Sequence, residues 1–270
     1  MRAGPLWTTY VAMTPEETRA RLLYRDGLIL VLNKPAGIPV HRGPKGGSSL
    51  EDDFDALRFG LPRKPALAHR LDRETAGCLV LGRHHKALEK LGLLFKQGKI
   101  AKTYWAIVAG APEAESGAIG LPLGRLDDRR GWWMKVDPKG QPARTLWRVK
   151  GRGVWRGALI AWLELEPKTG RTHQLRVHCA SQGWPILGDA VYGARADAPL
   201  QLLARKIVVP LTKGKPPIEV EAPAPPHMLE MLAACGFRDD RARNETVAAL
   251  IEWEGLSPPP RGEAGKIPEQ

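Results

Sequence analysis

The stretch AHRLDRETAGCLVLG (68–82) joins a charged loop to a continuous apolar run. The apolar run predicts a buried strand over 78–82. In the loop, Asp72 lies between Arg70 and Arg73. An aspartate in such a loop can be a solvated turn residue, an ion-pair partner that fixes the loop, or a catalytic acid whose charge its neighbours hold. Taken alone, the stretch favours an ordinary surface pair, so the choice depends on the rest of the chain.

Further strands and helices are predicted on both sides of this stretch. Apolar runs predict strands over 28–33, 102–110, 143–150, 158–166 and 206–209, with a polar, Gly-rich excursion at 111–142. Helical spacing and capping signals predict helices that begin at Thr14-Pro15, that span 48–60 with Gly60 as the stop, 85–98, 227–235 and 245–255, and that run from a capping Thr172 to about 182. Because strands and helices do not alternate strictly, we expect an α+β fold with a mainly antiparallel mixed β-sheet core and flanking helices and loops.

The charge balance of the chain is strongly basic. Its 270 residues include 41 Lys and Arg against 29 Asp and Glu, a net charge of +12, which predicts a polyanionic partner. No apolar run of 18 residues exists, so no transmembrane helix is expected, and the N-terminus lacks the apolar centre of a secretory signal. Cys78, Cys179 and Cys235 fit neither a disulfide framework nor a metal-binding pair, so we expect a cytoplasmic protein.

The positive charge concentrates in two segments. Residues 63–105 and residues 125–156 each carry ten Lys or Arg against three Asp or Glu, and both contain aromatic residues. Cations suit phosphates, and flat aromatic faces suit unstacked bases. This pattern favours a nucleic acid over a membrane as the partner.

Two shorter segments combine functional residue types with strand ends. LNKPAGIPVHRG (32–43) fixes an irregular loop after a strand, and its simplest interpretation is a connecting turn. In KTYWAIVAG (102–110), Tyr104 and Trp105 should face opposite sides of a strand. One of the two can therefore enter a site and stack on a base while the other packs in the core.

The segment LEPKTGRTHQLRVHCASQGWPILGDAVYG (165–193) is the most distinctive in the chain. It carries two arginines, Arg171 and Arg176, around a predicted helix start. Its histidines, His173 and His178, are five residues apart, which does not place them on one helical face as a metal-binding pair. We therefore expect no metal site here, and structural hydrogen bonds for both histidines.

The motifs LNKPAGIPVH, HRLDRETAG, KTYWAIVAG and TGRTHQLRVH…GWPILGDAVYG, in this order, resemble those of the RluA-type pseudouridine synthases. KVDPKGQPARTLWRV (135–149) also resembles the family's stretch between the Tyr and Arg motifs. The resemblance runs from about residue 22 to 222. It implies an N-terminal extension (1–21), a catalytic domain (22–222), a C-terminal helical extension (223–255) and a disordered tail (256–270).

The resemblance implies an enzyme that isomerises uridine in tRNA or ribosomal RNA to pseudouridine, with no cofactor or metal. Carried over by position, Asp72 is the catalytic aspartate, Tyr104 stacks on the target base and Arg176 pairs with the aspartate, with Arg171 of the same motif as the alternative. Asp72 would either attack the anomeric carbon or remove a neighbouring sugar proton. The residues expected to bind the substrate are His69, Arg70, Arg73, Arg171 and Leu175.

The chain departs from the family pattern at two places. Relatives usually have Ser where this chain has Ala76, and many read Leu-His-Ala where it has Leu203-Ala204-Arg205. The small N-terminal RNA-binding domain of many relatives has no room here, so we expect a monomer that binds RNA through the catalytic domain and its extensions. Two rival functions are a non-catalytic RNA-binding protein and a hydrolase. The hydrolase would favour a second carboxylate or a metal cluster near the motifs; neither is evident, and Glu74, the nearby candidate carboxylate, should face solvent.

Overall fold

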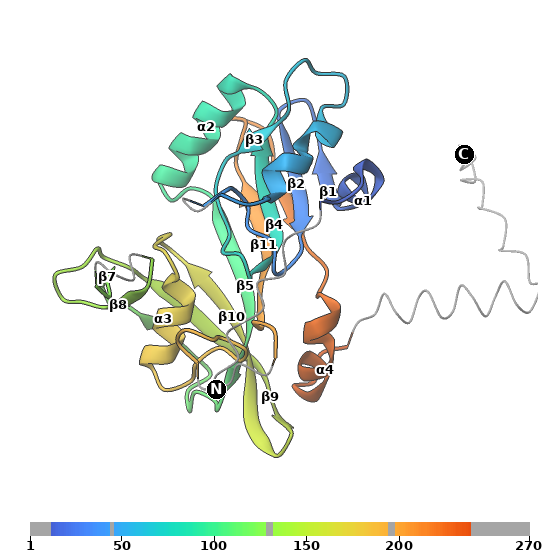
Figure 1. Cartoon of the computed structure of the whole chain (residues 1–270). Helices are drawn as coiled ribbons and strands as arrows, with labels where there is room; N and C mark the ends of the chain where they lie inside the picture. The colour runs from blue at the N-terminus through green and yellow to red at the C-terminus, as the bar shows by residue number, and fades with distance from the viewer. Residues whose placement is uncertain (1–11, 44–45, 128–131, 194–197, 239–270) are drawn as a thin grey trace, which may run out of the picture. The chain divides into compact units, whose positions relative to one another are not determined.

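A ten-stranded sheet runs through the computed structural model, which describes residues 12–43, 46–127, 132–193 and 198–238 (Figure 1). Its strands follow the order β1-β2-β4-β11-β5-β10-β9-β6, with β12 beside β11 and β3 beside β4, and β7 and β8 form a separate hairpin. The strands are β1 (Leu22–Arg25), β2 (Ile29–Lys34), β3 (Ala66–Leu67), β4 (Ala76–Gly82), β5 (Ala101–Ala109), β6 (Ser116–Ile119), β7 (Leu123–Arg125), β8 (Met134–Val136), β9 (Thr145–Trp155), β10 (Ala158–Pro167), β11 (Leu202–Val209) and β12 (Ile218–Glu221).

The pairing of the strands confirms the predicted α+β fold with a mainly antiparallel sheet. In the described ranges, β4 and β11 pair in parallel and the other strand pairs are antiparallel. Gly77 lies where the parallel pair forms: its φ is +110°, and a Cβ atom there would collide with the backbone of Ala204. The glycine that closes the HRLDRETAG motif is therefore required by the close approach of β11.

The predicted strands are confirmed, and the structure adds short ones. β9 and β11 are longer than predicted, while β1, β3, β6, β7, β8 and β12 were not expected. Each of the added strands contains only two to four residues, and such segments are too short for alternation to identify them. β6 pairs with the more distant β9, whereas each of the other added strands pairs with a strand next to it in chain order.

The helices are α1 (Pro15–Ala20), the 3₁₀ helix η1 (Leu50–Leu57), α2 (His85–Lys96), α3 (Gln174–Ser181) and α4 (Pro226–Ala234). Thr14 caps α1 through a capping box with Glu17, as its sequence predicts. No helix in the described part of the chain is long and apolar enough to cross a membrane. The helix predicted over 245–255 and the tail 256–270 lie outside the described residues.

Two helix predictions need correction. The segment 48–60 forms a 3₁₀ helix that ends at Leu57, because Phe59 (φ 44°) and Gly60 (φ 81°) have left-handed backbones that cannot continue it. Thr172 does not cap α3. The cap position belongs to His173, whose φ is 51° and whose side chain makes no capping hydrogen bond.

Two hydrophobic clusters lie on either side of the strand β5. One gathers residues of β2 and β4 with η1, and the other gathers residues of β5, β9 and β10 with α3. Tyr104 packs against both clusters. The start of β5, which Figure 1 shows passing between the two halves of the sheet, therefore places Tyr104 at their junction.

Candidate active site

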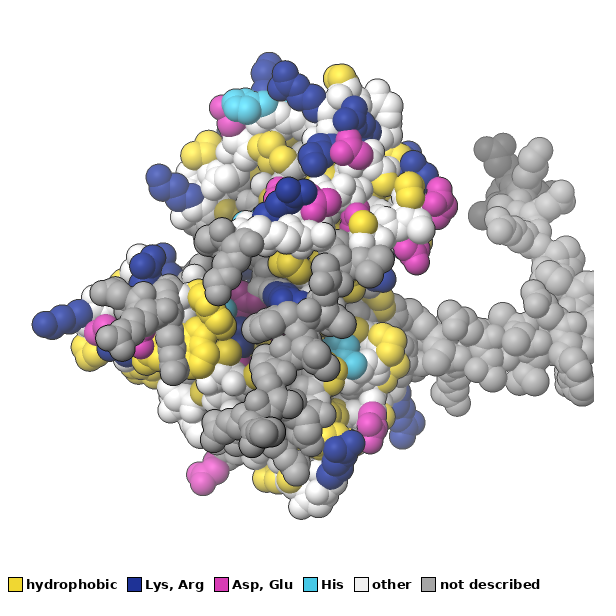
Figure 2. All heavy atoms as spheres, viewed as in Figure 1, with side chains coloured by type: hydrophobic (Ala, Val, Ile, Leu, Met, Phe, Trp, Pro, Cys, Tyr) yellow, Lys and Arg dark blue, Asp and Glu magenta, His cyan; other side chains and the backbone are white. Residues whose placement is uncertain are grey.

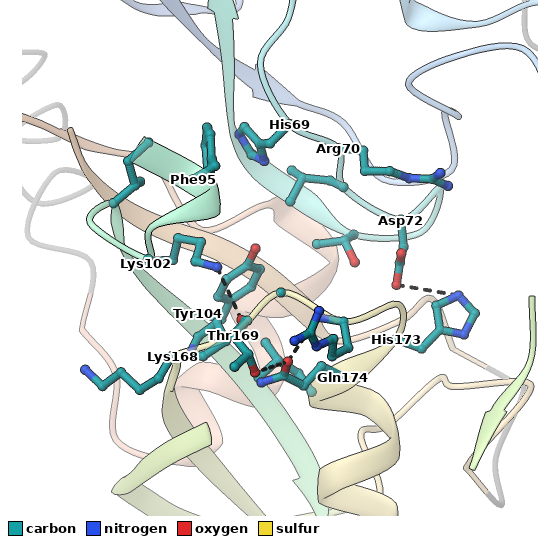
Figure 3. A pocket seen from close by; sticks show the side chains of 18 of the residues that line it. His69, Arg70, Asp72, Phe95, Lys102, Tyr104, Lys168, Thr169, His173 and Gln174 are labelled. Atoms are coloured by element: carbon teal, nitrogen blue, oxygen red, sulfur yellow. Dashed lines mark hydrogen bonds and ion pairs between the residues drawn. The ribbon is translucent and has the colours of Figure 1, made fainter. Parts of the chain in front are cut away.

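A cavity of about 620 Å³ opens at this junction, within the usual size range of ligand pockets. Asp72, Tyr104 and Arg176 line it, although they come from a loop, a strand and a helix far apart in the sequence. Figure 3 shows Asp72 and His173 facing each other at one end of this cavity, with Tyr104 nearby. The structure therefore brings the three predicted catalytic residues together.

Asp72 lies in the loop that connects β3 to β4, and its side chain is 26% exposed. Its Oδ2 atom is 3.5 Å from Nη1 of Arg176 and 3.8 Å from Nε2 of His173. The predicted pairing of Asp72 with Arg176, about a hundred residues away, is thus present as an ion pair. Glu74 is exposed and pairs with Arg73 at 3.5 Å, so it does not supply a second carboxylate to the cavity.

Arg176 is held mainly by a buried carboxylate, that of Asp189. Its Nε and Nη2 atoms donate to the two Asp189 oxygens at 2.7 and 2.8 Å. Asp189 also accepts from the amides of Val191 and Tyr192. Burial opposes the charge of Arg176, but the hydrogen bonds and charge of Asp189 outweigh it, so the pKa of Arg176 is raised. Asp189 was not predicted as a site residue, although it belongs to the motif GWPILGDAVYG.

Lys34, which is fully buried, supports the Asp72 loop from the protein interior. Its ammonium donates to the carbonyl oxygens of Pro35, Arg73 and Thr75 at 2.8, 2.8 and 2.9 Å. Burial lowers the pKa of Lys34 to about 7, against the attraction of the Glu74 and Asp72 charges. The segment 32–43 is therefore more than a connecting turn, because it supplies Lys34, which supports the Asp72 loop.

Arg73 takes part in this support and does not line the cavity. Its Nε donates to the carbonyl oxygen of Gly37 at 2.8 Å, and the Gly37 amide donates to the Arg73 carbonyl oxygen at 2.9 Å. These contacts favour a role for Arg73 in fixing the Asp72 loop. Its assignment to substrate binding is not supported by its position.

Tyr104 and Trp105 face opposite sides of β5, as predicted. Tyr104 lines the cavity, whereas Trp105 packs edge-on against Trp162 with ring centres 4.7 Å apart and lies under the guanidinium of Arg205 at 4.4 Å. Burial, with smaller contributions from the charges of Asp72 and Cys78, raises the pKa of Tyr104. The hydroxyl of Tyr104 is therefore protonated at neutral pH.

The other residues predicted to bind substrate lie on the cavity wall. Arg70 and Arg171 are exposed there, and Nε of Arg171 donates to the carbonyl oxygen of Pro142. Leu175 is buried in the wall. His69 accepts from the Val80 amide through Nε2, and burial, followed by the charge of Lys102, lowers its pKa to about 4. His69 is thus a neutral wall residue whose ring is held by β4.

The two histidines of the 165–193 segment differ in their roles. His178 makes the structural contacts predicted for it, with Thr145 Oγ1 at 2.9 Å and the Leu121 carbonyl oxygen at 3.0 Å. His173 also has a hydrogen-bond partner, the Tyr192 hydroxyl, but it lines the cavity and faces Asp72. His173 therefore makes the kind of structural hydrogen bond predicted for it, and its position beside Asp72 in the cavity is a contact that was not predicted. Among the described residues, no three His, Cys, Asp or Glu side chains gather in a way that could hold a metal ion.

Comparison with known proteins gives a consistent family. The family described as RNA pseudouridylate synthase matches residues 28–181. An RNA pseudouridine synthase of Zymomonas mobilis is 41% identical over 210 residues, covering 76% of this chain and 94% of that protein. The mitochondrial RNA pseudouridine synthase 3 of Oryza sativa is 38% identical over 206 residues, covering 66% of this chain and 42% of that protein. The solved structure of human RNA pseudouridylate synthase domain containing 4 has a TM-score of 0.69 at 26% identity, covering 83% of this chain and 96% of that chain. This chain belongs to the RluA-type RNA pseudouridylate synthase family, whose members are isomerases that act on RNA.

Proposed function

We propose that Asp72, Tyr104 and Arg176 carry out the isomerisation of a uridine in tRNA or ribosomal RNA. The observation that carries this proposal is the position of Asp72 on the wall of a cavity shared with Tyr104, with Arg176 3.5 Å from its Oδ2 atom. A partly exposed carboxylate beside a buried, permanently charged guanidinium is accessible and has a counter-charge within reach. Both properties are needed by a group that acts on a ribose.

The reaction breaks the bond between the ribose C1′ atom and uracil N1, turns the base, and joins C5 to the same C1′ atom. The C5 proton leaves and N1 gains a proton, so the formula of the nucleotide does not change. Asp72 would either attack C1′ or remove a neighbouring sugar proton. Tyr104, with its protonated hydroxyl, would stack on the base and could assist the late proton transfer from C5.

Access to the base requires that the uridine leave its stack, at a cost of a few kcal/mol. Figure 2 shows lysine and arginine side chains spread over the face drawn there. On the cavity wall, Arg70, Lys96, Lys102, Lys168 and Arg171 supply cations for the phosphates around the target. Burial lowers the pKa of Lys102, whose Nζ lies 3.4 Å from the Thr169 carbonyl oxygen.

Replacing Asp72 by Asn tests the proposal. The change keeps the volume and removes the charge, so we expect a folded protein that still binds RNA and forms no pseudouridine. Tyr104→Phe is the matched variant, because it keeps the stacking face and removes only the hydroxyl. Turnover is measured by tritium release from uridine labelled at C5. Residual turnover by purified Asp72→Asn would sink the assignment, and a severe loss in Tyr104→Phe would give the hydroxyl a direct role.

The RNA partner and the compartment are further parts of this proposal. We propose a monomer that acts in the cytoplasm, with 22–222 as its catalytic domain. The three cysteines are free and buried, which suits a reducing compartment, and the relative from Zymomonas mobilis is bacterial. The Oryza sativa relative is mitochondrial by name, so fractionation of the source cells is the direct check. Mapping pseudouridines in total RNA from cells with and without the protein would identify the RNA and the uridine.

A further inference from the structure

Asp72 is approached by two donors through the same oxygen atom. Nη1 of Arg176 and Nε2 of His173 lie 3.5 and 3.8 Å from its Oδ2 atom, and both side chains are only 8% exposed. The arginine is a charged donor, whereas burial, aided by the charges of Arg176 and Arg70, lowers the pKa of His173. The charges of Asp72 and Asp189 oppose this shift, but the imidazole remains neutral at neutral pH.

The tautomer of His173 follows from its second neighbour, Tyr192. The Tyr192 hydroxyl oxygen accepts from the Met134 amide at 2.8 Å and lies 2.8 Å from Nδ1 of His173. Burial raises the pKa of Tyr192, so the hydroxyl keeps its proton. Within the described ranges, Nδ1 of His173 is the acceptor in reach of that proton. When Nδ1 accepts, the ring proton of a neutral histidine is on Nε2, the atom that faces Asp72.

The backbone of His173 adopts a strained conformation where its ring faces Asp72. Its φ of 51° lies in the left-handed region, which is unusual and strained for a residue other than glycine. The ring occupies the cap position of α3 without capping the helix. The ring lies instead between the Tyr192 hydroxyl and the Asp72 carboxylate, and Figure 3 shows it facing Asp72.

We propose that His173 is a positioning residue that donates from Nε2 to Oδ2 of Asp72 when RNA is bound, and that the Tyr192 hydroxyl selects the tautomer that can do so. The proposal rests on the role proposed for Asp72 in the reaction. With Oδ2 held by Arg176 and His173, the other carboxylate oxygen, Oδ1, is left to act on the ribose. A neutral donor fixes the orientation of the carboxylate without adding a second positive charge beside it.

The turn that contains Tyr192, the partner of His173, also contains Asp189, the partner of Arg176. Tyr192 lies under the Arg176 guanidinium at 5.2 Å, and its amide donates to Asp189 at 3.0 Å. The turn 189–192 therefore holds both donors of Asp72, one through a carboxylate and the other through a hydroxyl. Tyr192 is accordingly a positioning residue as well.

Two substitutions of His173 distinguish the contact of Nε2 with Asp72 from the contact of Nδ1 with Tyr192. Glutamine places its amide nitrogen near the position of Nε2, whereas asparagine is one methylene shorter, reaches only the position of Nδ1, and tolerates a left-handed backbone. We expect His173→Asn to lower kcat by about 10- to 100-fold with KM changed by less than about threefold, as for loss of one hydrogen bond to a charged group. His173→Gln should recover at least part of kcat, and Tyr192→Phe should lower kcat by about 3- to 10-fold. Equal activity of the Asn and Gln variants, or wild-type activity of all three, would overturn the proposal.

A spectroscopic readout does not depend on activity. Nitrogen-15 NMR of the histidine rings in the full chain, with the His173 signal assigned from its loss in His173→Gln, reports the tautomer at pH 7.5. We expect the Nε2-protonated form in the wild type and a mixture in Tyr192→Phe. An Nδ1-protonated or charged ring in the wild type would overturn the proposal. If Asp72→Asn is inactive while the His173 variants behave as wild type, the positioning role alone fails; if Asp72→Asn is active, the proposed function fails with it.

Discussion

Two buried charges support the site from different sides, Lys34 beneath the Asp72 loop and Asp189 behind Arg176. Lys34 is 0% exposed and meets three backbone carbonyl oxygens, whereas Asp189 is 1% exposed and meets a guanidinium and two backbone amides. The groups in direct contact with the Lys34 ammonium are carbonyl dipoles. The Asp189 carboxylate is instead paired with the full positive charge of the Arg176 guanidinium. A buried charge without a paired counter-charge carries a larger desolvation penalty.

The pKa values express this difference. Burial lowers the pKa of Lys34 to about 7, so its charge is close to being lost at neutral pH. Burial alone would raise the pKa of Asp189, but the hydrogen bonds and charge of Arg176 outweigh it and the pKa is lowered. The α3 side of the site is therefore held by an ion pair that persists at all working pH values. The Asp72 loop is held by the Lys34 ammonium, whose charge changes with pH near neutrality.

The largest expected effect is on the α3 side, from Asp189→Asn. The change leaves Arg176 buried with its bidentate partner neutralised, so the free energy of unfolding should fall by about 3–5 kcal/mol. Urea denaturation measures the loss. Glu221→Gln is the matched control, because it neutralises a half-exposed partner of Arg205 and Lys206 and should cost less than about 1 kcal/mol. A loss no larger than that of the control would mean that Arg176 needs only Asp72.

The next effect is on the other side, from Lys34→Met. The variant leaves three carbonyl oxygens without their donor, but it also removes the penalty of burying a charge, so we expect a net loss of about 1–3 kcal/mol. Because the Asp72 loop loses this support, Lys34→Met should lower kcat more than it changes KM. Lys90→Met, on the exposed face of α2, should stay within about 0.5 kcal/mol of the wild type. A larger loss for Lys34→Met than for Asp189→Asn would reverse the ranking of the two supports.

The sequence predicts the proposed reacting groups of the site better than the residues that support them. Asp72, Tyr104 and Arg176 each lie in a motif whose residue types indicate chemistry. Lys34 stands in a motif as well, but nothing local indicates that its ammonium meets the Thr75 carbonyl oxygen 41 residues away. Backbone acceptors look the same in every residue, so only the folded chain identifies them.

The same limit applies to the fold. Long apolar runs such as those of β2, β4 and β5 were predictable because their burial requires them to be apolar. β3, with two residues, exists only because β4 offers it a partner. The contact of His173 with Asp72 was not predicted for a related reason: it depends on the left-handed entry to α3, which the sequence placed one residue earlier, at Thr172, and on a loop from a distant part of the chain.

The pH dependence of stability sharpens the comparison further. Below about pH 7, Lys34 is protonated in both the folded and the unfolded chain. Between about pH 7 and its ordinary value of 10.5, only the unfolded chain holds this proton, so unfolding takes up a proton and a higher pH disfavours it. The free energy of unfolding of the wild type should therefore rise relative to Lys34→Met by up to about 1.4 kcal/mol per pH unit above pH 7. Urea denaturation of both proteins between pH 6 and 9 checks this, and parallel curves would show that Lys34 keeps its proton.

The smallest effects are expected where each side meets the RNA. Arg70 belongs to the Asp72 loop and Arg171 to the segment that enters α3, and both are exposed on the cavity wall. If both contact phosphates, Arg70→Ala and Arg171→Ala should each weaken RNA binding by a few fold and reduce the slope of log affinity against log salt by about 1. Filter binding to total tRNA and to ribosomal RNA at several salt concentrations measures both slopes. An unchanged slope in one variant alone would mean that the phosphates are held from one side of the site, and that the two sides differ in binding as well as in support.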